Sequence, residues 1–218
     1  KSKRSFFGSF PQIGVPLGMI LATAVLLALT TILGKQQFAE WGWRLPFLFS
    51  IALIIVGSLI RRTVGESPVF EAMHKRKMES SAPVRHLLRF NARQVVQTAL
   101  VFIGNNAAGY LLIAFLISYG QKTLQLPADK LLMICTVAAA VWLAFTIIGG
   151  IMGDKIGRVR TFQIGYIALA LWSIPMWLLI DAGDLTLFAI AALVLAIPLG
   201  ITYGPQAALY AELFPARV

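Results

Sequence analysis

The segment LLMICTVAAAVWLAFTIIGGIMGDKIGRVR, residues 131–160, joins a long uncharged run to a short charged turn. Residues 131–153 carry no charged side chain, and Asp154, Lys155, Arg158 and Arg160 follow directly. An apolar run of about 20 residues is the length that an α-helix needs to cross a hydrocarbon core about 30 Å thick. This segment therefore predicts a membrane-spanning helix that ends in a turn at the membrane surface.

The same pattern repeats along the chain in both directions. Five further uncharged runs cover residues 5–34, 45–60, 94–121, 161–180 and 185–211. Hydrophobic residues make up 58% of the chain and charged residues only 13%, a balance typical of membrane proteins. We predict an all-α polytopic membrane protein with six transmembrane helices, which functions largely inside the bilayer.

The basic residues are distributed asymmetrically between the two sides of the predicted membrane. Of 19 Lys and Arg residues, 15 fall before the first run or after the second, fourth and sixth runs. The other four are Lys35, Arg44, Lys122 and Lys130. The positive-inside rule therefore predicts a multi-pass protein of the inner (plasma) membrane with both ends of this segment in the cytoplasm. The net charge of +10 then reflects topology and lipid contact, and argues against a nucleic-acid partner.

The only long connector covers residues 61–93 and divides the runs into two before it and four after it. Ser67-Pro68 is typical of a helix start, so we expect short amphipathic helices along the cytoplasmic surface. The chain begins with a basic stretch that lacks Met and stops just after a run. We therefore expect it to be a piece of a longer polytopic protein.

The turn GIMGDKIGRVR, residues 150–160, is the strongest local motif. Gly150 and Gly153 favour close helix packing, and Gly157 favours a tight turn. Asp154 can pair with Arg158 or face the positive N-terminus of a neighbouring helix. An ordinary positive-inside turn is the alternative interpretation.

This turn resembles the signature loop of the major facilitator superfamily, in which glycines flank an acidic and several basic residues. Other stretches are similar to that superfamily's metabolite:proton symporter branch, whose members carry shikimate, α-ketoglutarate, citrate, proline and betaine. They are Phe7–Gln12, Trp43–Phe47, Glu66–Phe70, Tyr203–Pro205 and Ala211–Pro215. The branch's membrane-embedded acid and arginine do not occur in this segment, so the resemblance names no proton-coupling residue here.

The position of the loop makes the six runs resemble helices 5 to 10 of a twelve-helix transporter. The resemblance implies that residues 1–60 hold the last two helices of the N-terminal bundle. Residues 61–93 would then be the cytoplasmic linker, and residues 94–218 the first four helices of the C-terminal bundle. The rest of a twelve-helix chain, the lipid bilayer, a small polar metabolite and protons would be the partners.

Polar side chains inside the apolar runs are candidates for binding substrate. Asn106 and Tyr110 stand four residues apart with Asn105 beside them, and Tyr203, Gln206 and Tyr210 share a face of the last run. Such groups often mark a substrate pathway, but hydrogen bonds between helices explain them equally well from chemistry alone. The resemblance favours substrate binding, because the corresponding helices of the superfamily line its central cavity.

The sequence thus predicts a proton-coupled symporter of an organic acid or zwitterion that works by alternating access. The expected gating loop consists of Gly150, Asp154, Lys155, Gly157, Arg158, Arg160 and Glu212. Alternatives are the membrane domain of an ATP-driven permease and a non-transporting sensor on the same scaffold. We find no zinc pattern, nucleophile–histidine pair or phosphate-binding glycine loop, and expect neither enzymatic activity nor a cofactor.

Overall fold

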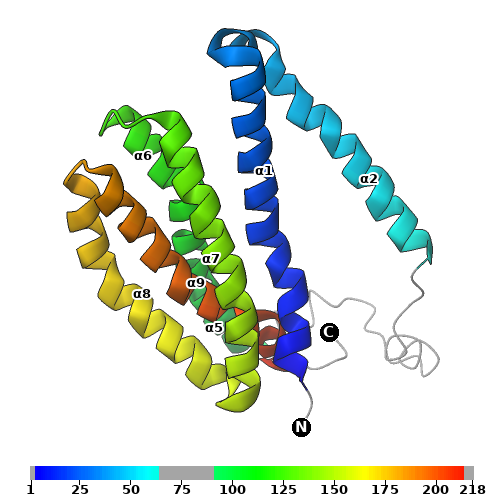
Figure 1. Ribbon diagram of the computed structural model, residues 1–218. Helices are drawn as coiled ribbons and strands as arrows, with labels where there is room; N and C mark the ends of the chain where they lie inside the picture. The colour runs from blue at the N-terminus through cyan, green and yellow to red at the C-terminus, as the bar shows by residue number, and fades with distance from the viewer. Residues whose placement is uncertain (1–2, 64–90, 214–218) are drawn as a thin grey trace. The chain divides into compact units, whose positions relative to one another are not determined.

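The computed structural model describes residues 3–63 and 91–213, which form helices joined by short connections (Figure 1). The elements are α1 (Arg4–Glu40), η1 (Gly42–Arg44), α2 (Leu45–Thr63), α5 (Ala92–Tyr110), η2 (Leu111–Phe115), α6 (Leu116–Lys122), α7 (Ala128–Lys155), α8 (Arg158–Asp181) and α9 (Leu185–Leu213). The segment η2 is a single π-helical turn that continues α5 into α6. The described residues contain no strand, so the all-α prediction is confirmed.

Six helical segments are long and apolar enough to cross a membrane. They are Arg4–Gly34, Gly42–Thr63, Ala92–Lys122, Ala128–Lys155, Arg158–Asp181 and Leu185–Leu213. Their limits lie within three residues of the predicted runs, because the runs end where charged residues begin. Residues 64–90 of the predicted linker, with its amphipathic helices, lie outside the described residues, and the division into two bundles stays a prediction.

The chain forms two compact units. Of the described residues, 3–24 and 96–213 form the larger unit, and 25–63 and 91–95 form the smaller unit. In the smaller unit, Gly34 has a positive φ of 75° and interrupts the helical conformation of α1. There, the guanidinium of Arg44 lies 4.5 Å from the centre of the Trp43 ring, an arrangement typical of an aromatic anchor at a membrane surface.

In the larger unit, α9 packs against both α7 and α8 and carries many of the buried residues. Short connections make α7 and α8, and α8 and α9, antiparallel neighbours, so α7 and α9 run in the same direction. The core between them contains Trp142, Phe188 and Leu199, all fully buried. Side chains such as Ile167, Leu171 and Ile174 point outward and are more than half exposed, as a helix in contact with lipid requires.

Glycines allow α7 and α9 to touch through their backbones toward the ends that carry Asp154 and Glu212. A Cβ atom on Gly149 would lie 2.6 Å from the carbonyl oxygen of Ile201, and one on Gly200 would lie 2.7 Å from that of Trp142. Gly149 and Gly153 on α7, and Gly200 and Gly204 on α9, are each spaced four apart. This is the small-residue spacing by which membrane helices approach closely.

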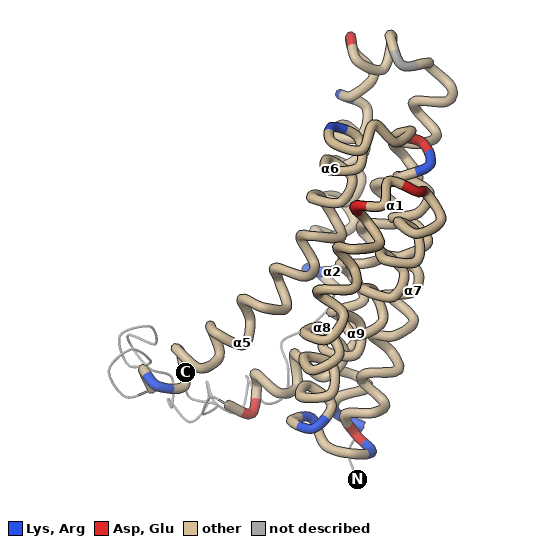
Figure 2. The backbone as a smooth tube through the Cα atoms, turned by 90° about the vertical axis from the view of Figure 1, so that its left-hand side faces the viewer, with Lys and Arg blue, Asp and Glu red and all other residues tan. Residues whose placement is uncertain are grey.

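Charged residues of α7, α8 and α9 gather at the helix ends (Figure 2). Asp154, Lys155, Arg158 and Arg160 lie at the ends joined by the short α7–α8 turn, and Glu212, which pairs with Arg158, lies near the end of α9 on the same side. The opposite ends carry Asp129, Lys130, Asp181 and, between helices, Asp184. The uncharged middles match the thickness of a bilayer core, and the excess of bases lies at the end predicted to be cytoplasmic.

Candidate functional site

The carboxylate of Asp154 binds the N-terminus of α1. It accepts hydrogen bonds from the backbone N–H groups of Ser5 at 2.9 Å and Phe6 at 3.0 Å. The first amides of a helix have no partner within the helix, and the helix dipole favours a negative charge beside them. Asp154 thus joins the end of α7 to the start of α1 across 149 positions of sequence.

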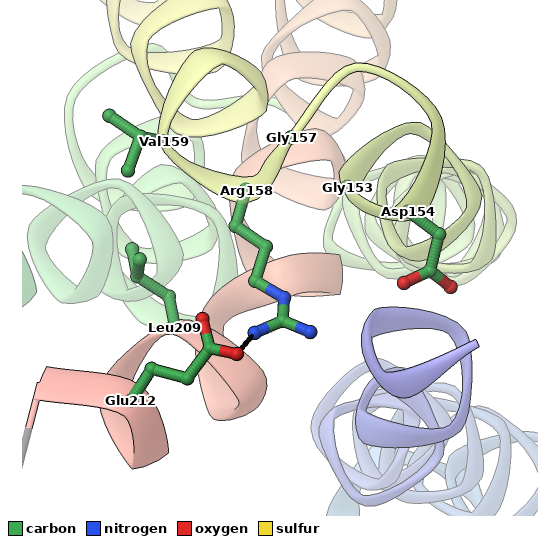
Figure 3. Close-up of a pocket in the computed structure, with 7 residues that line it drawn as sticks. All are labelled: Gly153, Asp154, Gly157, Arg158, Val159, Leu209 and Glu212. Atoms are coloured by element: carbon green, nitrogen blue, oxygen red, sulfur yellow. Dashed lines mark ion pairs between the residues drawn. The ribbon is translucent and has the colours of Figure 1, made fainter. Parts of the chain in front are cut away.

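Arg158 connects three helices at the same end of the unit. It belongs to the first turn of α8, its Nε donates to the hydroxyl oxygen of Ser5 at 2.8 Å, and its guanidinium pairs with Glu212 of α9. Figure 3 shows Arg158 between Glu212 and the α1 helix. Of the two partners expected for Asp154, the structure therefore shows the helix N-terminus, and Arg158 pairs with Glu212 instead. We call Ser5, Asp154, Arg158 and Glu212 the latch.

The glycines of the turn make room for these contacts. A Cβ atom on Gly150 would lie 3.0 Å from the Ser9 side chain, and one on Gly153 would lie 3.1 Å from that of Ser5. Gly157 has a φ of 95°, a conformation that residues with a side chain rarely adopt. It lets the chain end α7 and begin α8 within two residues, which places Arg158 on a new helix.

A hollow of about 380 Å³ lies beside the latch and is lined by Gly153, Asp154, Gly157, Arg158, Val159, Leu209 and Glu212. Figure 3 shows these residues around the Arg158–Glu212 ion pair. Lys155 and Arg160, the other two charged residues of the predicted loop, are exposed on the same turn. The residues of the predicted gating loop thus lie at the ends of α7, α8 and α9 beside the start of α1, and their gating role stays a prediction.

A second cluster of polar groups lies inside the membrane-spanning part, between α5 and α9. The Nδ2 of Asn105 donates to Oε1 of Gln206 at 2.6 Å, and the hydroxyl of Thr202 donates to Oδ1 of Asn105 at 2.6 Å. All three side chains are buried. Because a buried polar group without a partner is costly, this network holds the two helices in one register.

Aromatic side chains surround this network. The rings of Trp142 and Tyr203 meet edge to face with their centres 5.0 Å apart, and both lie close to Gly109 of α5. Tyr210 packs its ring against Phe102 and Phe162. The indole nitrogen of Trp142 and the hydroxyl of Tyr210 are buried without a hydrogen-bond partner among the described residues. The neighbourhood therefore holds two buried donor groups whose hydrogen bonds are not satisfied by the described residues.

Two of the predicted substrate residues form no hydrogen bond with the Asn105–Gln206–Thr202 network among the described residues. Asn106 donates to the carbonyl oxygen of Phe102 on its own helix, and the side chain of Tyr110 is 66% exposed. It is Asn105 that bonds to α9, through Gln206 and Thr202, and Tyr203 lies on the same helix. Neither arrangement tests substrate binding, and that role stays a prediction for all six residues.

Sequence reasoning missed Ser5 and Thr202. Thr202 stands four residues before Gln206, so the helical spacing that grouped Tyr203 with Gln206 could have included it. No sequence pattern singles out Ser5, whose role depends on the approach of α1 to α7. Within residues 3–63 and 91–213, no group of three His, Cys, Asp or Glu side chains is placed to hold a metal ion.

Comparison with known proteins places these features in a family. Residues 1–218 match the model described as Major Facilitator Superfamily. The chain is 32% identical over 99% of its length to the inner membrane metabolite transport protein YhjE of Escherichia coli, of which it covers 50%. It is 31% identical over its full length to a putative metabolite transport protein of Haemophilus influenzae, of which it covers 52%.

A proline/betaine transporter of Salmonella typhimurium is 27% identical over 99% of the chain, which covers 45% of that protein. The chain thus spans about half the length of the curated relatives it matches. No solved structure matches. These relatives are named as transport proteins, and with the six apolar helices they identify a multi-pass membrane protein.

Proposed function

Because the chain belongs to the Major Facilitator Superfamily, we propose that it forms part of a secondary transporter for a small polar metabolite. The observation that carries this proposal is the family match over the whole chain, together with relatives named as metabolite transport proteins. Nothing in the described helices favours the first alternative, the membrane domain of an ATP-driven permease. The second alternative, a non-transporting sensor, would be excluded if transport by the full-length protein is measured.

We infer that the substrate is an organic acid or a zwitterion, as the names of the proline/betaine relatives suggest. The buried groups of Asn105, Gln206 and Tyr203 are neutral donors and acceptors. They suit a ligand carboxylate without leaving a full charge in the bilayer when the site is empty. A hydrogen bond to a charged ligand is worth about 1.5–3 kcal/mol, which is enough to select such a substrate.

The latch supports alternating access as the mechanism. In the arrangement described here, Asp154 and Arg158 tie the start of α1 to α7, α8 and α9 at the end proposed to be cytoplasmic. Breaking these contacts would free α1 at that end and open a path to the substrate. Each bond can be exchanged for water at the membrane surface, so opening needs only modest energy.

Proton coupling and orientation complete the proposal. The acidic side chains of the described helices lie at or near helix ends, so the group that binds the transported proton lies elsewhere in the full protein. The basic excess supports cytoplasmic placement of both ends of the segment. The name of the relative YhjE supports an inner membrane. The bundle division at residues 61–93 belongs to the same proposal.

Uptake by the full-length protein in proteoliposomes tests this function. Radiolabelled proline, glycine betaine and a dicarboxylate should be compared with and without an inward proton gradient, first in the absence of ATP and then with ATP supplied. We expect at least one substrate to accumulate under the gradient and to leak out when a protonophore is added. Accumulation that needs ATP would overturn secondary transport, and accumulation that ignores the protonophore would overturn proton coupling alone.

A further inference from the structure

An apolar groove runs between α5 and α8 on the outer face of the larger unit. It shares no residue with the latch and lies next to the polar network, since its lining residues Gly104 and Ala108 flank Asn105 on α5. It has a volume of about 300 Å³, and Gly104, Ala107, Leu111, Tyr166, Ala170 and Ser173 are among its lining residues. Ala107 and Ala170 are exposed, so the groove opens toward the surroundings of the bundle. Its lining is mostly apolar and includes several small residues, as a groove that holds an acyl chain requires.

The groove leads to Trp177, which belongs to an aromatic cluster near the end of α8. The rings of Phe115 and Tyr119 are stacked with centres 5.7 Å apart, and Trp177 stands edge-on to both at 5.8 Å. Phe115 is 46% exposed, so part of this cluster is accessible to a ligand. The faces of aromatic rings attract ammonium groups.

A carboxylate lies directly against this cluster. Tyr119 donates its hydroxyl to Oδ1 of Asp181 at 2.9 Å, across the gap between α6 and α8. Asp181 is exposed and forms no ion pair within residues 3–63 and 91–213. Its second oxygen is therefore available to an ammonium group that also meets the rings.

One turn beyond Tyr119, on the same side of α6, the chain carries Lys122, which is exposed. Asp181 at the end of α8 and Lys122 at the end of α6 are an acid and a base that complement a zwitterionic headgroup, with its amine toward Asp181 and its phosphate toward Lys122. Along α8, Tyr166 lies eleven residues before Trp177, which corresponds to about 16 Å at 1.5 Å per residue. That length accommodates much of one acyl chain.

We propose that this groove and cluster form a binding site for a phospholipid with a primary-amine headgroup, phosphatidylethanolamine in chemical class. In the proposed orientation the lipid lies in the extracytoplasmic leaflet. Its acyl chain fills the α5–α8 groove, and its ammonium group binds Asp181 beside Tyr119 and Trp177. This inference concerns lipid binding and does not depend on what the protein transports.

Native mass spectrometry of the full-length protein tests the site. Delipidated protein is titrated separately with phosphatidylethanolamine, phosphatidylcholine and phosphatidylglycerol. We expect preferential retention of phosphatidylethanolamine, and about fivefold weaker binding in Asp181→Asn, since an exposed ion pair contributes up to about that factor. Asp129→Asn removes an exposed acid at the same end of the unit and should leave binding unchanged.

Substitutions in the groove test the acyl chain separately. Ala170→Phe should reduce retention of phosphatidylethanolamine, whereas Ile174→Phe, at a position 72% exposed outside the groove, should not. Retention that is equal for the three lipids, or unaffected by both Asp181→Asn and Ala170→Phe, would overturn the proposal. That result would show that the aromatic cluster is an ordinary interfacial anchor, or that another part of the full chain covers the groove.

Discussion

Replacement of Gly204 by alanine tests whether α7 and α9 are held together through their backbones. A Cβ atom at this position would lie 2.6 Å from the carbonyl carbon of Gly149, and closer still to the Gly150 nitrogen and the Thr146 carbonyl oxygen. Ordinary contacts between carbon atoms are about 3.5–4.0 Å. The helices must therefore separate by about 1 Å, because no flexible side chain is present to move aside.

The expected loss of stability follows from two opposing effects. Overpacking of a tight core costs about 1–3 kcal/mol. Gly204 should lie at the upper end of that range, because the atoms that its Cβ would meet are all backbone atoms of α7. Alanine recovers about 1 kcal/mol because it favours the helical conformation more than glycine does. We therefore expect Gly204→Ala to lower the free energy of unfolding by about 2 kcal/mol.

Reversible unfolding of the purified full-length protein, titrated with denaturing detergent, measures this change. Gly18→Ala is the matched control, because no heavy atom lies within 4 Å of a Cβ atom built there, and it should be neutral or slightly stabilising. Gly149→Ala should resemble Gly204→Ala, and the double variant should lose less than the sum, because the first substitution already separates the helices. Wild-type stability of Gly204→Ala, or an equal loss in Gly18→Ala, would refute the backbone contact.

Four further predictions follow from the site, the caps and the topology. Asp154→Ala should impair transport while membrane insertion stays intact, with Asp129→Ala, at the opposite end of the unit, as the control; wild-type uptake at normal expression would contradict the latch. If Asn105 and Gln206 bind substrate, Asn105→Ala should weaken the apparent affinity for substrate roughly tenfold or more. If these residues only join helices, Asn105→Ala should lower stability and leave the affinity unchanged. Asn106→Ala, which removes a side chain outside the network, is the comparison for both measurements. Asp184 accepts hydrogen bonds from the backbone N–H groups of Leu187 and Thr186 at the start of α9, and these bonds hold the pKa of its carboxyl below the ordinary value of 3.8. The contribution of Asp184 to folding stability should therefore be complete above pH 3.8 and disappear as the pH falls through the lower folded-state pKa. The difference in unfolding free energy between wild type and Asp184→Ala should shrink in that pH window. In a Cys135→Ala background, Gln37→Cys and Gln125→Cys should react with an impermeant thiol reagent from outside and Val159→Cys should not; the opposite labelling would reverse the topology.

The membrane spans were predictable from sequence because the bilayer imposes a simple rule on them. Charged residues are excluded from its core, so each span could be delimited by its flanking charges. Residues 131–153 were predicted to be a span, and α7 extends only three residues before and two after them. The six helices and the family followed from the same reasoning, together with the motif at residues 150–160.

The partners within the sites were less predictable. Asp154 and Arg158 are four residues apart, which suggests an ion pair on one helix, but α7 ends at Lys155 and Gly157 turns the chain into α8. The spacing therefore spans two helices, and Arg158 reaches Glu212. Asn105 and Asn106 could not be distinguished either, because the surrounding apolar residues do not show which face of α5 packs against α9.

The close approach of α7 and α9 has a mechanical consequence for the latch. Two helices whose backbones touch over several turns cannot rotate or slide independently without breaking many contacts at once. Asp154 at the end of α7 and Glu212 near the end of α9 are therefore attached to one rigid pair of helices. A displacement of α1 that moves Asp154 should move this helix pair as a unit, including Tyr203 and Gln206, which lie deeper in the membrane. Release at the surface and rearrangement of the buried polar network should then occur as one movement.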